Sequence, residues 1–123
     1  MPDLRAVPPS PPAGSRGARV TIGVAHLGLA AVWLVLGVRV IPSFEDMFAD
    51  FGASLPWLTM MVLERGWPVV GLLVDLAGFA CAFVPPRWLW LGFALATVSA
   101  LLLVVTGMAL YAPIFEMARN VGP

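Results

Sequence analysis

Asp75 is the one charged residue in the apolar stretch that runs from Gly66 to Pro86 of this 123-residue chain. If that stretch crosses a membrane, an ionised carboxylate near its middle costs about 2.5 to 3.5 kcal/mol on insertion scales. Such a side chain must find a partner and face other helices. Acids in these positions either carry protons or ions, or fix the way the helices pack. We expect Asp75 to point into a helix bundle, and both roles stay open.

Three polar side chains are candidate partners of Asp75. Thr97 follows Pro86 by as many residues as Asp75 precedes it, so its hydroxyl is the expected hydrogen-bond partner if the flanking helices form a hairpin. His26 lies about one turn nearer the cytoplasm, and Arg39 approaches from the other side on a stem that can extend toward the carboxylate. An Asp75–His26 pair would respond to protons, whereas a protonated or paired aspartate would only hold the helices in register.

The sequence offers no catalytic or metal-binding pattern. His26 is the only histidine and Cys81 the only cysteine, so neither has a second ligand at metal-binding spacing. A glycine-rich phosphate loop, a His-Glu-x-x-His helix and a Ser-x-x-Lys nucleophile are all missing from the sequence. The formal net charge of zero gives no reason to expect nucleic acid. We therefore expect no enzyme, no cofactor, no metal site and no nucleic-acid partner.

The composition is that of a membrane protein. Hydrophobic residues make up 60% of the chain and charged residues 11%, and the mean hydropathy is +0.93, which leaves too little polar surface for a water-soluble domain. Three apolar runs have the length of a membrane-crossing helix: 20–41, 67–84 and 88–111. The sequence predicts an all-α membrane protein whose three transmembrane helices form one domain, residues 20–123. Residues 85–87 can only be a tight turn.

The first and last apolar runs end in the same pattern, Pro-x-Phe-Glu. It is read as Pro42-Ser-Phe44-Glu and as Pro113-Ile-Phe115-Glu. Proline interrupts the backbone hydrogen bonds of a helix, and an aromatic residue followed by a charge suits the boundary between hydrocarbon and headgroups. The pattern predicts that both membrane helices stop here.

Segment 43–66, between the first two predicted spans, is predicted to be an interfacial amphipathic helix. Its apolar residues recur at intervals of three and four, with acidic residues on the opposite face. The apolar positions are Phe44, Met47, Phe48, Phe51, Leu55, Leu58 and Val62, and the acids are Glu45, Asp46 and Asp50. Gly52 should end a first part, and Pro56 should lie in the first turn of a second. We expect the segment to lie along the membrane or against the bundle; the alternative is an ordinary loop.

Residues 1–19 are rich in proline and arginine and are predicted to be a disordered tail. Arginine is frequent in this tail and occurs again at Arg87, whereas segment 43–66 carries four acids and only Arg65. The positive-inside rule then places the N-terminus and the turn at 85–87 in the cytoplasm and the C-terminus outside. We expect a multi-pass protein of a bacterial inner membrane.

Small residues follow one face of each predicted span. Gly71, Gly78 and Ala82 share a face with Asp75; Gly23, Ala30 and Gly37 share one on the first span; Gly92, Ala96 and Ser99 share one on the third. Such stripes let helix backbones approach closely. They predict packing seams, either within the bundle or with a second copy of the chain.

Two segments also resemble a known family. The ordered residues Pro42, Phe44, Met47, Phe48, Gly52, Leu55, Pro56 and Thr59 are similar to the segment after the first membrane helix of the inner-membrane platform proteins of type II secretion and type IV pilus machines, the F family. The closing Tyr111-Ala-Pro113-Ile-Phe115-Glu116 resembles the end of that family's last membrane helix.

Family members also carry two cytoplasmic helical domains that engage the motor ATPase. In their places this chain has the tail and the turn at 85–87. The resemblance therefore implies a membrane core of the platform type, without the parts that engage an ATPase.

Two roles fit these features. The first is a scaffold or accessory component of a secretion or pilus-like assembly, which binds lipid, other membrane helices and components of that assembly. The second is a small proton- or ion-responsive transport or pore subunit, in which Asp75, His26, Thr97 and Thr106 line a polar path between several copies. A remnant without separate activity is a third possibility.

Overall fold

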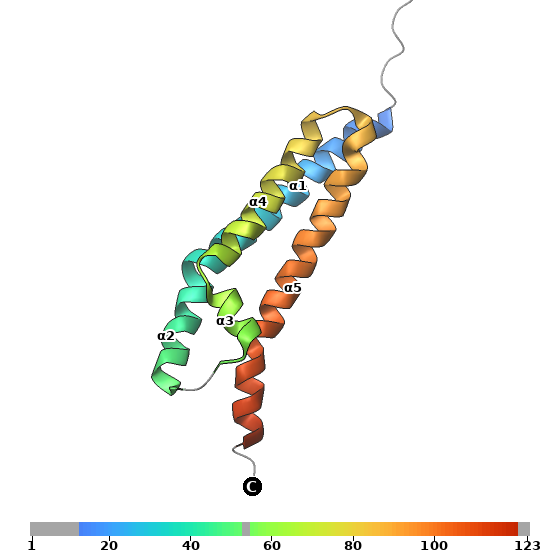
Figure 1. Cartoon of the computed structure of the whole chain (residues 1–123). Coiled ribbons are helices and arrows are strands. Elements are labelled where there is room, and N and C mark those ends of the chain that lie inside the picture. Colours follow the sequence, from blue (N-terminus) through green and yellow to red (C-terminus); the bar gives the residue numbers. More distant parts are fainter. Residues whose placement is uncertain (1–12, 53–54, 121–123) are drawn as a thin grey trace, which may run out of the picture.

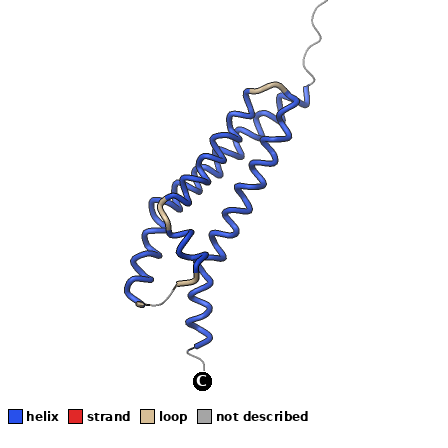
Figure 2. Tube along the Cα trace, viewed as in Figure 1, coloured by secondary structure: helices blue, strands red, loops and turns tan. Residues whose placement is uncertain are grey.

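The computed structural model describes residues 13–52 and 55–120, and every regular element in these ranges is helical. In chain order the elements are α1 (Ala13–Val35), a π-helical turn (Leu36–Val40), α2 (Ile41–Phe51), α3 (Trp57–Leu63), α4 (Gly66–Ala80), two 3₁₀ turns (Cys81–Phe83 and Pro86–Trp88) and α5 (Leu89–Asn120). Figure 2 shows that only short connections separate the described helices.

Three of the helices form an elongated bundle (Figure 1). α1 and α4 lie side by side, and α5 packs against both. The start of α1 and the turn between α4 and α5 lie at one end, whereas α2, α3 and the last turns of α5 lie at the other. In the described ranges, three helical stretches are long and apolar enough to cross a membrane: Ser15–Asp50, Gly66–Phe83 and Pro86–Arg119. The predicted all-α fold with three spanning helices is confirmed.

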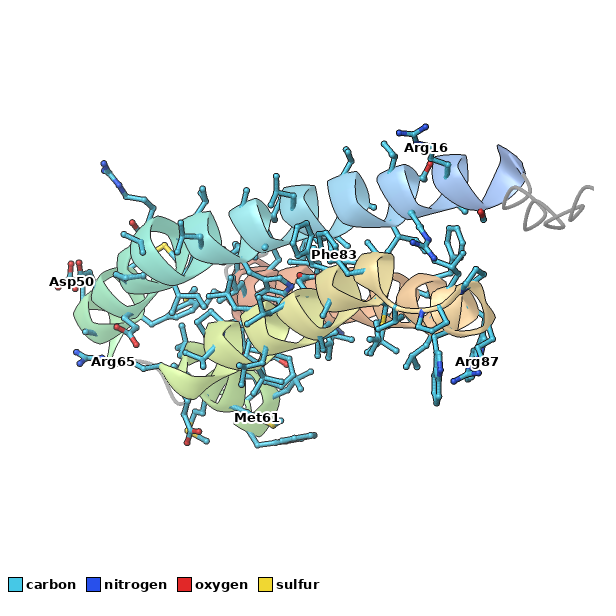
Figure 3. All side chains as sticks on the ribbon, turned by 90° about the horizontal axis from the view of Figure 1, so that it is seen from above. Arg16, Asp50, Met61, Arg65, Phe83 and Arg87 are labelled. Atoms are coloured by element: carbon cyan, nitrogen blue, oxygen red, sulfur yellow. The ribbon has the colours of Figure 1, made fainter. Side chains whose placement is uncertain are left out.

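The sides of the bundle are apolar and its ends are charged. Large hydrophobic side chains are exposed on all three long helices, for example Val24 on α1, Leu76 on α4 and Leu101 on α5. In Figure 3 the labelled Arg16 and Arg87 lie at one end, and Asp50 and Arg65 lie at the other. An apolar surface of this extent suits a bundle whose sides face lipid.

α1 and α4 approach each other closely where α4 carries glycine. A Cβ added at Gly71 would overlap the indole of Trp33, and one added at Gly78 would overlap the imidazole of His26. Larger residues at these positions would force the helices apart. The predicted small-residue face of the second span is therefore confirmed as the seam against α1.

α1 begins at Ala13, before the predicted start of the span. The predicted disordered tail, residues 1–19, is wrong for residues 13–19, which are helical; residues 1–12 lie outside the described part. No proline occurs between residues 13 and 41, so every residue of this stretch can donate a backbone hydrogen bond, and the helix begins before the predicted span.

The sequence pattern predicted that the first membrane helix ends at Pro42, but the helix continues beyond it. Helical structure is continuous from Ser15 to Asp50, and Pro42 lies in the first turn of α2. A π-helical turn precedes it, in which the N–H of Ile41 donates to the carbonyl of Leu36, five residues back. The wider turn relieves the clash between a proline ring and the preceding carbonyls, so the helix continues through the proline.

Pro113 does not end α5 either, because a side chain from another helix replaces the hydrogen bond that the proline removes. Proline has no N–H to donate to the carbonyl four residues earlier, which here belongs to Ala109. Thr59, on α3, is fully buried and donates its hydroxyl to that carbonyl over 2.7 Å. α5 continues to Asn120.

Segment 43–66 folds as two short helices against the bundle. Gly52, with φ of 59°, ends α2, as the sequence predicts. α3 begins at Trp57, so Pro56 is its N-cap residue and does not lie in the first turn as predicted. The apolar faces of α2 and α3 meet α5 in one buried cluster, formed by Ile41, Phe48, Val62, Leu63, Ala109 and Leu110. Phe44 adds an edge-to-face contact with Tyr111, with ring centroids 5.9 Å apart. Of the two predicted placements, the segment takes the one against the bundle.

Candidate functional site

Asp75 lies at the middle of the bundle with both carboxylate oxygens bonded. It is at the centre of the Gly66–Phe83 stretch and is 1% exposed. Its Oδ1 lies 2.8 Å from Nδ1 of His26, and its Oδ2 accepts a hydrogen bond from Oγ of Ser99 over 2.9 Å. Of the three candidate partners, His26 is the one that contacts Asp75, and the carboxylate points into the bundle as expected.

The hydrogen bonds continue at both ends of this contact. Nε1 of Trp33 donates to Oγ of Ser99 over 3.0 Å, and Nε2 of His26 donates to the carbonyl of Gly92 over 3.0 Å. We call the four side chains and this carbonyl the polar network. It joins α1, α4 and α5, its side chains are almost completely buried, and each of their polar atoms has a partner.

The bonding pattern fixes the number of protons that the His26–Asp75 pair holds. A backbone carbonyl only accepts, so Nε2 of His26 carries the hydrogen that bonds Gly92. The contact of 2.8 Å between Nδ1 and Oδ1 needs one more proton, on either atom. An imidazolium beside a carboxylate and an imidazole beside a carboxylic acid both satisfy this, and both leave the pair without net charge. The pair is a neutral unit, which an apolar span tolerates far better than a lone charge.

Helix register positions the network. His26 and Gly92 are 66 residues apart, and so are Trp33 and Ser99. α1 and α5 therefore run in parallel with the same offset over two helical turns, and the face of α1 that carries His26 also carries Trp33. α4 runs antiparallel between these contacts and supplies Asp75. Both side chains from α1 rest over glycines of α4, which leaves room for their rings.

Thr97, the predicted partner of Asp75, lies on the wrong face of α5. It is exposed, and its hydroxyl donates to the carbonyl of Phe93 in its own helix over 3.0 Å. The prediction counted residues symmetrically about Pro86, but Asp75 bonds Ser99, which lies two residues further along α5. The register is displaced from Thr97 to Ser99, and a step of two residues rotates a helix position by roughly 200°.

Ser99 was missed as a partner, although the sequence contained the signal. It belongs to the small-residue stripe of the third span together with Gly92 and Ala96, and that stripe faces the bundle. A hydroxyl on the packing face of the third span is a better candidate than one placed by counting alone.

Arg39 and Thr106 do not join the network. Arg39 is exposed, and no hydrogen bond or ion pair within the described ranges joins it to Asp75. Thr106 is buried, but its hydroxyl accepts from Nε1 of Trp67 over 2.8 Å and donates to the carbonyl of Leu102 over 2.7 Å. Thr97 and Thr106 therefore bond groups outside the polar network and do not extend it into a polar path.

A groove between α1 and α4 passes beside the His26–Asp75 pair. Its volume is about 310 Å³, and apart from the pair it is lined by Leu27, Ala30, Leu72, Leu76 and Phe79. These side chains give it an apolar wall, and His26 itself is 0% exposed. The groove therefore offers no polar route to the pair.

The described residues hold no group of three or more histidine, cysteine, aspartate and glutamate side chains that could bind a metal ion. Cys81 is buried as a free thiol, and its Cβ lies near the position that a Cβ of Gly92 would take. It is a packing residue between α4 and α5.

No protein-family model, curated protein or solved structure matches this chain.

Proposed function

We propose that this protein is a small multi-pass scaffold of a bacterial inner membrane, an accessory component of a secretion or pilus-like assembly. Its N-terminal end faces the cytoplasm, and α2 and α3 lie on the outer side of the membrane. It works by holding three helices in a fixed register and presenting their outer faces to lipid and to other membrane helices.

The observation that supports the scaffold role best is the closed polar network. Every polar side-chain atom of His26, Asp75, Ser99 and Trp33 is bonded to another helix of the same bundle. Buried polar groups that are fully satisfied fix one packing arrangement among several apolar alternatives. A transport path needs polar groups with free bonding capacity along the membrane, whereas here the bonding capacity is used within the bundle.

The secretion context rests on the resemblance stated above, and one contact supports it. The two segments that carry the resemblance are far apart in sequence, yet Thr59 of the first bonds the carbonyl that Pro113 of the second leaves free. Phe44 and Tyr111 join the same two segments through their rings. The residues of both segments therefore act as one packing unit, which gives a physical reason for them to occur together.

The alternative, a proton-responsive transport subunit, is favoured by the His26–Asp75 contact. The pair holds one shared proton near the middle of the membrane, the position that proton relays use. Transport would require this proton to be exchanged with both sides.

Asp75→Asn separates the two roles. The amide NH₂ can donate to Nδ1 of His26 and the amide oxygen can accept from Ser99, so the variant keeps both hydrogen bonds but lacks the shared proton. In proteoliposomes with a pH-sensitive dye, the scaffold role predicts the same slow proton flux for wild type, variant and empty vesicles. Flux above empty vesicles in the wild type that is lost in a well-folded Asp75→Asn variant would establish transport and refute the scaffold role.

Partner binding tests the assembly role directly. The tagged chain, solubilised in mild detergent from its native membrane and analysed by mass spectrometry, should co-purify with components of a secretion or pilus-like machine. A tagged three-span protein of unrelated sequence is the control for non-specific capture. Recovery of the chain without such components, from cells that express the machine, would contradict the proposal.

A further inference from the structure

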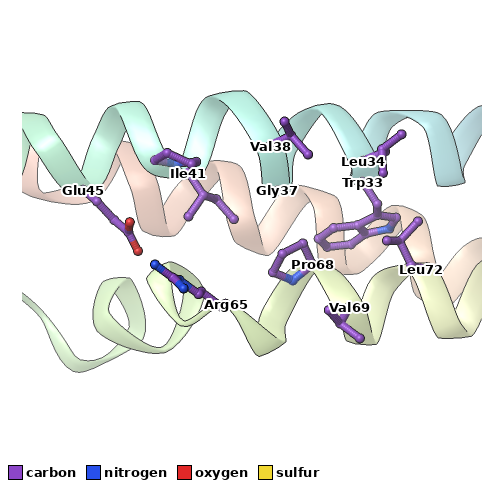
Figure 4. Close-up of a pocket in the computed structure, with 11 residues that line it drawn as sticks. Trp33, Leu34, Gly37, Val38, Ile41, Glu45, Arg65, Pro68, Val69 and Leu72 are labelled. Atoms are coloured by element: carbon purple, nitrogen blue, oxygen red, sulfur yellow. The ribbon is translucent and has the colours of Figure 1, made fainter.

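A second groove opens between α1 and α4, nearer to α2 and α3 (Figure 4). Its volume is about 430 Å³. Most of its wall is apolar, with the indole of Trp33 at one end and Val69 and Leu72 along the α4 side. The opposite end carries two charges, Glu45 and Arg65, whose side chains point toward one another in Figure 4. The groove is thus apolar along its length and charged at one end.

The charged end lies at the depth of lipid headgroups. Arg65 directly precedes α4, and Asp75 is at the middle of that span. Ten residues of helix rise about 15 Å, which is half of the roughly 30 Å hydrocarbon core. Arg65 therefore sits where hydrocarbon meets headgroups, and the apolar wall lies at the depth of the acyl chains.

The side chains of Glu45 and Arg65 can both form hydrogen bonds to a bound headgroup. Glu45 and Arg65 are both exposed, and within the described ranges no ion pair joins them. A guanidinium offers a planar set of donors that suits a phosphate, and a carboxylate accepts hydrogen bonds from a primary ammonium. A headgroup that carries both a phosphate and an amine satisfies the two side chains at once.

The walls of the groove are held in place by contacts between the helices. Its α1 wall includes the π-helical turn, a feature that is frequent at functional sites. At Gly37 an added Cβ would lie 3.1 Å from Cβ of Pro68, so the two helices are in close contact beneath the groove. Trp33 is held by its hydrogen bond to Ser99, which fixes the orientation of its ring.

We propose that this groove binds one zwitterionic aminophospholipid, with an acyl chain along Val69 and Leu72, the phosphate on Arg65 and the ammonium on Glu45. A lipid without the amine would place its phosphate beside Glu45 and leave that carboxylate without a cationic partner of its own. A lipid with a quaternary ammonium has no N–H to donate to that carboxylate. The groove therefore selects phosphatidylethanolamine over phosphatidylglycerol and phosphatidylcholine.

Native mass spectrometry of the detergent-purified full chain tests this binding. Phosphatidylethanolamine, phosphatidylglycerol and phosphatidylcholine are each added to the delipidated protein, and the dissociation constant of the first bound lipid is compared. The wild type should prefer phosphatidylethanolamine by about tenfold, the factor that corresponds to about 1.4 kcal/mol. Glu45→Gln should remove this preference, and Arg65→Gln should weaken binding of all three lipids.

Two neighbouring valines supply a matched control for the apolar part. Val69 lines the groove and is 51% exposed, whereas Val70 is 49% exposed and does not line it. Val69→Trp fills the groove and should abolish binding of the first lipid, and Val70→Trp should leave it unchanged. Folding of both variants is checked by thermal unfolding in detergent.

Four results would overturn the proposal. The first is equal binding of the three lipids to the wild type, and the second is an unchanged preference in the folded Glu45→Gln variant. The third is equal binding to the folded Val69→Trp and Val70→Trp variants. The fourth is a dimer that lipid does not displace and that only Val69→Trp dissociates, which would assign the groove to a second copy of the chain.

Discussion

The imidazole of His26 rests directly over Gly78, and a methyl group at residue 78 would occupy the space of that ring. This relationship couples the packing of α1 against α4 to the polar network, because the ring that fills the space over the glycine also bonds Asp75 and Gly92. A defect in packing at this point must therefore also break hydrogen bonds at the middle of the membrane.

Gly78→Ala should destabilise the bundle, because the added Cβ would overlap the buried imidazole of His26, so the ring must move and its hydrogen bonds to Asp75 and Gly92 are lost or weakened. Overpacking of a dense core costs about 1 to 3 kcal/mol, and loss of the His26–Asp75 contact adds to that. Gly28→Ala is the control, since a Cβ there meets no atom within 4 Å. Thermal unfolding in detergent, followed by size-exclusion chromatography, should show a lower midpoint for Gly78→Ala alone; equal midpoints would contradict the packing argument.

Ser99→Ala should be more destabilising than Thr97→Ala. Removal of the Ser99 hydroxyl leaves the indole N–H of Trp33 and one oxygen of Asp75 without a partner in a buried site, at a cost of about 1 to 3 kcal/mol. Thr97 is exposed and bonds only its own helix, so its loss should change stability by less than about 0.5 kcal/mol. Unfolding by sodium dodecyl sulfate in mixed micelles measures both. A larger effect of Thr97→Ala would show that the register between α4 and α5 is wrong.

The helices and the contact between Asp75 and His26 could be predicted because they depend on local patterns. Apolar runs of membrane-crossing length specify the spans, and a lone acid in such a run needs a polar partner at a similar depth. The only histidine of the chain lies at that depth in another span. Small-residue stripes likewise identified the faces that pack together, since close approach needs small side chains whatever the details of the fold.

The remaining errors arise where tertiary structure overrides a local rule. The sequence around Pro113 predicts the end of a helix, but the hydroxyl of Thr59, 50 residues from Ala109 in sequence, donates to the carbonyl that the proline leaves without a donor. The sequence around Pro42 also predicts a helix end, but the preceding π-helical turn lets the helix continue through the proline. Counting residues symmetrically about Pro86 selects Thr97, which lies two residues before the actual partner, Ser99. The accommodation of the two prolines has no sequence signal that could be weighed without the neighbouring helices, whereas the small-residue stripe of the third span does indicate Ser99.

The two ends of the bundle should be accessible from opposite sides of the membrane, with Arg16 and Arg87 on the cytoplasmic side. Single cysteines at Arg16, Arg87, Asp50 and Arg119, all exposed positions, are introduced into a Cys81→Ala background. A membrane-impermeant maleimide applied to intact spheroplasts should label the cysteines at 50 and 119, and those at 16 and 87 only after lysis. Labelling of positions 50 and 87 from the same side would contradict the bundle topology.

The hydroxyl of Thr59 should matter only as long as residue 113 is proline. Thr59→Val keeps the shape of the side chain but leaves the buried carbonyl of Ala109 without a donor, which should destabilise the protein by about 1 to 2 kcal/mol. Pro113→Ala restores a backbone N–H four residues beyond Ala109, so the carbonyl regains a partner within α5. In the Pro113→Ala background, Thr59→Val should therefore be nearly neutral.

A double-mutant cycle measured by unfolding in mixed micelles gives the coupling between the two positions, expected at about 1 kcal/mol. Thr21→Val is the control in both backgrounds, because the Thr21 hydroxyl is exposed and bonds the carbonyl of Gly17 in its own helix. If Thr59→Val is equally destabilising with proline and with alanine at position 113, the hydroxyl acts through packing. Helix α5 must then tolerate its proline by another means.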